Sequence, residues 1–269
     1  MNFDNAYASL TVAPNGVGTL SIQNAGSLNI LGTPVINGIC EALAHVAHTP
    51  GVRVLILRGQ GDKAFVAGAD IKEMAALTHE TASVFISQLR KLCEAVRQLP
   101  IPVIARIPGW TLGAGLEFAL CCDLRIASSA TKLGMPEVKV GIPSVIHAAL
   151  MPRLIGKSRA TWMLLTGEII DADQGLNWGM LDKVVELEQL DAEVTRIAND
   201  LAELGTQVLA QQKRMMREWE DEPLETSIDK SIDEFASAFD TGEPQHYMGK
   251  FLKEKQQQSK PTQPTIRSE

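Results

Sequence analysis

Two stretches of the sequence decide its fold, and the first reads Ala64-Phe65-Val66-Ala67-Gly68-Ala69-Asp70. A short apolar run leads here into small residues, and the pattern from Asp70 to Met74 indicates the start of a helix. Small residues let a ligand approach the backbone closely, and the first turn of a helix leaves N–H groups unpaired. The stretch therefore predicts a strand-to-helix turn that can present a backbone N–H to a ligand.

The second stretch has the same design and reads Pro108-Gly109-Trp110-Thr111-Leu112-Gly113-Ala114-Gly115-Leu116-Glu117. Two such turns can aim two backbone donors at one developing negative charge, which is the arrangement of an oxyanion hole. Two carboxylates, Glu117 and Glu137, lie in or after this stretch. They make proton transfer the chemistry to expect.

Outward from these stretches, strand and helix patterns alternate. Before residue 130 we expect a hairpin at 7–13 and 17–23, helices at 34–48, 80–98 and 116–121, and strands at 54–57, 102–105 and 124–127. This order suggests an α/β fold of stacked βαβ units, with ligands beyond the strand ends. From residue 144 onward strand signals fade, apart from Val184-Val185, and we expect helices at 158–166, 189–204, 206–219 and 225–239.

These patterns predict three segments along the chain. We expect an α/β core over residues 1–200 and a helical region over residues 201–255, which packs on the cores or is swapped between them. The polar, proline-containing tail, residues 256–269, is expected to be disordered.

Composition excludes several classes of protein. The formal net charge of −7 argues against a general nucleic-acid binder, which shows a basic surface. No apolar run approaches the roughly 18 residues of a membrane span, and residues 1–5 lack the basic and apolar regions of a signal peptide. We therefore expect a soluble, cytoplasmic protein that binds neither nucleic acid nor membrane.

Neither the cysteines nor the histidines suggest a cofactor. The four cysteines contain no C-x-x-C pair and are interpreted as free, buried thiols; they are Cys40, Cys93, Cys121 and Cys122. Of the five histidines only His45 and His48 can share a helix face, and no further ligands accompany them. We expect no metal and no redox cofactor.

The quoted residues resemble the crotonase, or enoyl-CoA hydratase/isomerase, superfamily. The resemblance is densest over residues 63–74, continues through residues 109–123 and 133–141, and resumes at residues 153–157 and 165–168. It implies a crotonase-like α/β fold, in which stacked ββα units form a superhelical core, followed by a C-terminal helical trimerisation region. It also implies a homotrimer or a dimer of trimers.

The resemblance also implies roles for single residues. Ala69 and Ala114 take the places of the two oxyanion-hole donors, where glycine is more usual at the second. Glu117 and Glu137 resemble the glutamates that position water and move protons, with Glu137 as the principal acid/base at C2 and Glu117 helping to activate the water. Residues expected to contact CoA or the substrate are Ala67, Gly68, Lys72, Ser144 and His147.

Simpler interpretations stay open for several of these residues. Glu117 and Glu137 can be carboxylates that stabilise helix starts, and Asp70 is better explained as a helix cap than as a catalyst. His147 is more typical of a structural or pocket-lining histidine than of a base.

Two segments depart from the pattern of the superfamily. The loop Gly141–His147 carries bulkier residues where relatives often have glycines, which leaves the shape of the acyl pocket open. Residues 24–31 contain Ala25-Gly26 where relatives commonly have Arg-Pro, in a segment that often helps to hold CoA.

The implied function is hydration of a 2-enoyl-CoA to a 3-hydroxyacyl-CoA, with CoA as part of the substrate and not as a held cofactor. Alternatives on the same fold are a double-bond isomerase, a hydrolase, a decarboxylase or a non-catalytic binding protein. An RNA-binding relative should show a lysine-rich exposed helix, and the first expected helix, Val35 to His48, contains neither lysine nor arginine.

Overall fold

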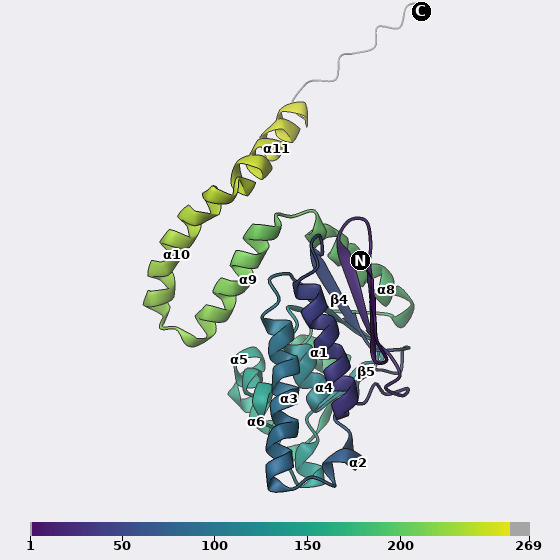
Figure 1. The fold of residues 1–269 in the computed structure, drawn as a ribbon. Helices are drawn as coiled ribbons and strands as arrows, with labels where there is room; N and C mark the ends of the chain where they lie inside the picture. The colour runs from purple at the N-terminus through teal and green to yellow at the C-terminus, as the bar shows by residue number, and fades with distance from the viewer. Residues whose placement is uncertain (1, 259–269) are drawn as a thin grey trace, which may run out of the picture. The chain divides into compact units, whose positions relative to one another are not determined.

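The computed structural model describes residues 2–258, which fall into two compact units that divide between Leu204 and Gly205 (Figure 1). The first unit is built on two sheets. The larger has the order β1-β2-β3-β4-β6-β8-β11. Its strands are β1 (Phe3–Asp4), β2 (Ala8–Val12), β3 (Val17–Ile22), β4 (Val54–Arg58), β6 (Val103–Ile107), β8 (Leu124–Ser128) and β11 (Lys183–Val185).

The larger sheet begins as the expected antiparallel hairpin β2–β3 and is parallel from β3 through β11. The parallel strands are nearly continuous apolar runs because both faces of the sheet are covered. In β4, Leu55 and Leu57 point into the core that holds helices α1 (Thr33–Ala47) and α3 (His79–Arg97), which lie side by side in Figure 1. Val54 and Ile56 point to the opposite face, which α8 (Leu187–Ala202) covers.

Local sequence explains why these helices form. In α1, Pro34 occupies the first turn, where its missing N–H costs nothing. Helical spacing then buries one side of α1, namely Val35, Ile36, Ile39, Leu43 and Val46. In α3, Thr78 and Thr81 form a reciprocal capping box that satisfies two backbone donors at the helix start.

The smaller sheet, of order β10-β9-β7-β5, carries the two quoted stretches. Its strands are β5 (Ala64–Val66), β7 (Trp110–Leu112), β9 (Lys132–Gly134) and β10 (Ile169–Asp171). The remaining helices of this unit are α2 (Ile71–Met74), α4 (Ala114–Leu120), α5 (Met151–Ile155), α6 (Lys157–Thr166), α7 (Ala172–Asn177) and the 3₁₀ helices η1 (Glu137–Val140) and η2 (Ile146–Leu150).

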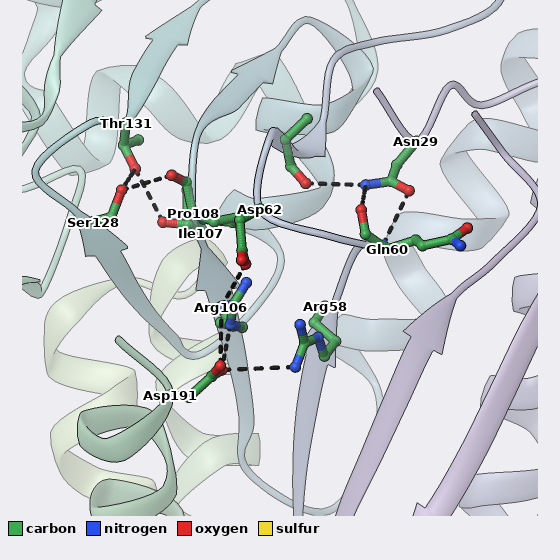
Figure 2. A network of polar contacts seen from close by, with 11 residues as sticks. Asn29, Arg58, Gln60, Asp62, Arg106, Ile107, Pro108, Ser128, Thr131 and Asp191 are labelled. Atoms are coloured by element: carbon green, nitrogen blue, oxygen red, sulfur yellow. Dashed lines mark hydrogen bonds and ion pairs between the residues drawn. The ribbon is translucent and has the colours of Figure 1, made fainter. Parts of the chain in front are cut away.

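A buried arginine links the larger sheet to its surroundings (Figure 2). Arg106 on β6 is 2% exposed and forms ion pairs with Asp62 at 2.7 Å and with Asp191 of α8 at 2.5 Å. A buried guanidinium without its partners is costly, so these carboxylates hold α8 and the loop before β5 against β6.

The second unit is helical, with α9 (Thr206–Asp221), α10 (Leu224–Ala238), η3 (Phe239–Thr241) and α11 (Glu243–Gln258). Arg214 of α9 pairs with Glu234 of α10 at 2.6 Å, and Glu243 accepts the N–H of Val208 at the start of α9. Leu224, Ile232 and Phe235 of α10 are largely exposed in the chain by itself. The trimerisation role of this region stays a prediction.

Most of the expected elements are present, and three differences have a physical cause. The strand β10 was not expected, because beyond residue 144 only Val184-Val185 showed a strand signal; antiparallel pairing with β9 stabilises this short edge strand. Helix α11 was also not expected, because its polar sequence has little apolar periodicity. It extends to Gln258, so residues 256–258 are helical; residues 259–269 of the expected disordered tail lie outside the described residues.

Within residues 2–258, no helix combines the length and the apolar character that crossing a membrane requires.

Candidate active site

The two quoted stretches meet because the strands that lead into them are parallel neighbours. Val66 of β5 is paired with Thr111 of β7, so both strands end at the same edge of the smaller sheet. Gly115 brings the turns closer still, since a Cβ there would collide with the backbone of Val66. The first turn of α4 therefore packs directly against the end of β5.

The first turn leaves one backbone donor unused. Leu31 N–H donates to Gly68 O at 3.0 Å, and Asp70 N–H donates to Leu31 O at 3.0 Å. The Ala69 N–H between them donates to no acceptor among the described residues. Gly68 has φ +119°, a conformation that favours glycine and turns the chain at this point.

Asp70 fulfils the expected cap. Its carboxylate accepts the N–H groups of Lys72 and Glu73, which begins α2 directly after the turn.

Asn29 holds the chain segment before this turn and was not identified from the sequence. It is fully buried with φ +52°, a left-handed conformation that asparagine tolerates better than most residues. Its side chain donates to the carbonyls of Gln60 and Ala64 and accepts the N–H of Gln60 (Figure 2). The neighbouring Leu28 carbonyl accepts the N–H of Ala67 at 2.9 Å. The segment that departs from the superfamily pattern thus supports the first turn through backbone contacts.

The second turn leaves a matching donor. Gly113, with φ +53°, donates its N–H to Gly134 O at 2.9 Å. Ala114 is the first residue of α4, and its N–H has no acceptor among the described residues. A Cβ on Gly113 would collide with the carboxylate of Glu137, so this glycine lets the carboxylate lie over the turn.

Both residues with an unused N–H line one cavity of about 830 Å³, a size typical of ligand sites. Ala69 and Ala114 line it together with Glu117 and Glu137. The expected contact residues Ala67, Gly68 and Ser144 also lie on its wall. Most of the remaining wall is apolar and comes from α3 and the loop after η1, including Phe85, Ile86, Leu89, Ile142 and Val145.

Glu117 is the more buried of the two carboxyl groups. It is 4% exposed, which excludes a solvated surface role, and its Oε1 accepts the N–H of Ala148 at 2.9 Å. Burial disfavours the charged form and raises the pKa of Glu117 to about 8, although the Ala148 hydrogen bond opposes this. A carboxyl group whose pKa lies near neutrality is suited to general acid–base catalysis.

Glu137 begins η1 and is half-buried at the cavity wall. Burial raises its pKa, whereas hydrogen bonds from its own backbone N–H and from the Ser144 hydroxyl act in the opposite direction. The site therefore holds two carboxyl groups in different environments, an arrangement that enzymes use to separate acid and base roles.

Two expected contact residues do not lie on this wall. Lys72 is exposed on α2, and His147 is buried behind Glu117, where its Nε2 donates to Glu94 Oε1 at 2.8 Å. Within the described residues the cavity wall includes neither side chain. The contribution of α3 to the site was missed, because its pattern indicated only an amphipathic helix.

The structure also gathers a group of side chains that the sequence did not connect. Cys93 of α3, Cys121 after α4 and His147 of η2 place their ligand-type atoms within 4.8 Å of one another. This is the one group of three or more side chains in the described part of the chain whose spacing suits a metal ion. The pair His45 and His48 is not part of such a group. All four cysteines are free thiols, as expected, but only Cys93, Cys121 and Cys122 are buried; Cys40 is half-buried.

Comparison with known proteins gives consistent similarities. The chain matches the enoyl-CoA hydratase/isomerase family over residues 12–260. It is 35% identical over 241 residues to the crotonyl-CoA hydratase of Syntrophomonas wolfei subsp. wolfei, covering 88% of this chain and 91% of that relative. It is 34% identical over 188 residues to the human mitochondrial methylglutaconyl-CoA hydratase, covering 70% of this chain and 56% of that protein.

The same similarity extends to solved structures. The crystal structure of an enoyl-CoA hydratase from Bacillus anthracis superposes with a TM-score of 0.88 at 30% identity, covering 92% of this chain and 96% of that one.

Proposed function

Because the chain belongs to the enoyl-CoA hydratase/isomerase family, we propose that it adds water to the double bond of a 2-enoyl-CoA and forms a 3-hydroxyacyl-CoA. The expected family and crotonase-like fold are confirmed. One observation supports hydration in particular. Two unused backbone donors, at Ala69 and Ala114, share a cavity wall with two carboxyl groups, Glu117 and Glu137.

The two backbone N–H donors bind the thioester carbonyl in this proposal. In the proposed complex the carbonyl oxygen of the thioester accepts the N–H groups of Ala69 and Ala114. Addition of an oxygen nucleophile at C3 moves negative charge onto this oxygen, and the donors stabilise the resulting enolate. The loss of one such donor typically raises the barrier by roughly 2.7–4 kcal/mol.

The two carboxyl groups transfer the protons that the addition of water requires. The water oxygen forms a bond to C3 while one of its protons passes to the ionised carboxylate. The protonated carboxyl group delivers its own proton to C2, so one water is added and the pair again holds one proton. Glu137 as the acid/base at C2 and Glu117 as the group that activates water stay the proposed division. This division requires Glu117, whose pKa is raised to about 8, to give up its proton before water attacks, so that the single proton of the pair lies on Glu137.

The apolar wall sets the class of acyl group. Phe85, Ile86 and Leu89 of α3 and Val145 of the loop line the cavity, whose wall also includes Lys139. Because most of this wall is apolar, we propose an uncharged, apolar acyl chain. The absence of a prosthetic group, assembly as a homotrimer or a dimer of trimers, and a cytoplasmic location stay predictions.

The test uses crotonyl-CoA. Loss of the absorbance of the conjugated enoyl thioester, with a product heavier by one water and still attached to CoA, is the expected result. A product of unchanged mass would instead indicate isomerisation, and free CoA would indicate hydrolysis; either outcome contradicts the proposal.

Two variants connect the activity to the site. Glu137→Gln and Glu117→Gln each remove one proton-transfer group and should lower kcat at least about 100-fold, the low end of general acid–base contributions. Glu41→Gln on α1, whose carboxylate is exposed and bonds Asn5, is the matched control and should retain full activity. Full activity in both site variants would exclude the proposed roles.

A further inference from the structure

The carboxyl group of Glu117 is held by a backbone donor from a different element. Ala148 N–H, in η2, is shared between Val145 O at 3.0 Å and Glu117 Oε1 at 2.9 Å. The orientation of Glu117 toward the cavity therefore depends on the position of η2.

The start of η2 is strained. Ile146 has φ +41°, a left-handed conformation that a β-branched residue strongly disfavours. Such a conformation persists only where the surroundings hold it, and it is often found at functional sites. Contacts of η2 with the elements around it must therefore keep it in place.

His147 provides that contact. Its ring is 6% exposed, and Nε2 donates to Glu94 Oε1 of α3 at 2.8 Å, across 53 residues of sequence. Glu94 is itself held by Arg97 at 3.1 Å and by the Gln98 amide at 3.1 Å. A hydrogen bond between a carboxylate and imidazole thus ties η2 to the adjacent helix.

Titratable groups lie near His147 on two of the elements packed against η2. Cys93 and Glu94 belong to α3, with Arg97 beside Glu94, and Glu117 and Cys121 belong to α4 and its end. The hydrogen bond with Cys121 lowers the pKa of Cys93 to about 6, and His147 adds to this effect. Burial opposes the charged form of His147, but Cys93 and Glu94 outweigh it and raise its pKa. Cys93 and Glu94 therefore both favour the protonated form of the His147 ring.

We propose that His147 is a positioning residue for Glu117: its hydrogen bond to Glu94 fixes η2, and η2 aims the N–H of Ala148 at the Glu117 carboxyl group. The inference rests on the proposed hydration, in which Glu117 transfers a proton. His147 itself reaches no substrate.

A matched pair of variants isolates the hydrogen bond between His147 and Glu94, which we call the anchor. In His147→Gln, the amide nitrogen occupies nearly the same distance along the side chain as Nε2 and still donates to Glu94. In His147→Asn, the amide is too short to reach Glu94. Both variants are uncharged, so the loss of imidazolium charge is common to them and cancels in the comparison.

The expected difference lies in kcat and in the pH profile. His147→Asn should have a kcat at least about tenfold below that of His147→Gln, with similar KM, because a hydrogen bond to a charged group is lost. The Ala148 bond lowers the pKa of Glu117, so weakening it should move the alkaline limb of the profile to higher pH in His147→Asn than in His147→Gln. Equal kcat and equal pH profiles in the two variants would overturn the proposal.

A second pair tests the same bond from the other side and covers the case in which His147→Asn does not fold. Glu94→Gln keeps an oxygen acceptor for Nε2, whereas Glu94→Ala removes it. Glu94→Gln should behave as His147→Gln and Glu94→Ala as His147→Asn. A kcat of Glu94→Ala equal to that of Glu94→Gln would contradict the anchoring role.

An infrared titration separates this inference from the proposed function. The protonated carboxyl band of Glu117, assigned by its loss in Glu117→Gln, reports the pKa without any turnover. If wild-type protein does not hydrate crotonyl-CoA, the proposed function fails, while an unequal Glu117 pKa in the two His147 variants still supports the anchor. Zinc bound stoichiometrically to the purified protein and lost in His147→Gln would overturn the anchor, since His147 would then be a ligand.

Discussion

The Ser144 hydroxyl donates a 2.9 Å hydrogen bond to Oε2 of Glu137, seven residues earlier in the chain. The chain turns back between them at Gly141, which has φ +81° and ends η1. The loop that departs from the glycine-rich pattern of the superfamily therefore holds one of the two site carboxyl groups with a side chain. This bond opposes the effect of burial on the pKa of Glu137.

Ser144→Ala should impair proton transfer by Glu137. Removing the hydroxyl raises the pKa of Glu137 and releases its carboxylate, so kcat should fall about tenfold, as expected for one hydrogen bond to a charged group. The acid limb of the kcat/KM profile should move to higher pH. Ser129→Ala is the matched control, because Ser129 makes a similar 2.8 Å bond to the exposed Glu186. An equal fall in kcat in Ser129→Ala would contradict a specific role of the Ser144 hydroxyl.

Gly113→Ala should abolish activity through the displacement of Glu137. The new Cβ collides with the Glu137 carboxylate, in addition to the cost of φ +53°. Gly61→Ala supplies the control, since Gly61 has φ +70° and open space around the position of a Cβ. Gly61→Ala should lose about 1–2 kcal/mol of unfolding free energy and keep its turnover. Steady-state kinetics and denaturation of both variants would show whether the collision or the backbone conformation matters.

The activity should have a bell-shaped dependence on pH. The carboxyl pair must hold one proton, so kcat/KM falls where both groups are protonated and again where both are ionised. The alkaline limb should lie near pH 8, the pKa that burial gives Glu117. In Glu117→Gln the residual activity should lack this limb. A wild-type profile that stays flat from pH 7 to about 10 would exclude Glu117 as a proton-transfer group.

Ionisation of the buried Glu117 should lower the free energy of unfolding at alkaline pH. Its pKa is about 8 in the folded chain and near 4.5 in the unfolded chain, so the folded state binds the proton more tightly. The stabilisation that results from this tighter proton binding is fully present below pH 4.5 and is lost as the pH rises to about 8. Glu117→Gln, which keeps an acceptor for Ala148, should therefore exceed the unfolding free energy of wild type by roughly 4 kcal/mol at pH 8 and equal it near pH 4. Denaturant unfolding at both pH values, with Glu41→Gln as control, measures this difference; a constant difference would contradict it.

Local patterns in the sequence were sufficient for the central strands, the two turns and the long helices other than α11. Apolar runs such as Val54–Leu57 and helical spacing such as that of residues 34–48 result from burial along one element. Elements that depend on a partner were missed: β10 is three residues long and exists because it pairs with β9. Strand register and strand pairing depend on contacts between segments that are distant in sequence, so the periodicity of one segment cannot predict them.

The sequence by itself determined the chemical groups of the candidate site: two turns of small residues with free N–H groups, and two glutamates close to the second turn. Only the tertiary structure decided how these groups are surrounded. Parallel pairing of β5 with β7 set the two turns side by side, and packing of η2 on α3 joined His147 to Glu94 and turned His147 away from the cavity. Burial, which raises the pKa of Glu117, is likewise a property of the assembled fold, because desolvation depends on every element that covers the carboxyl group.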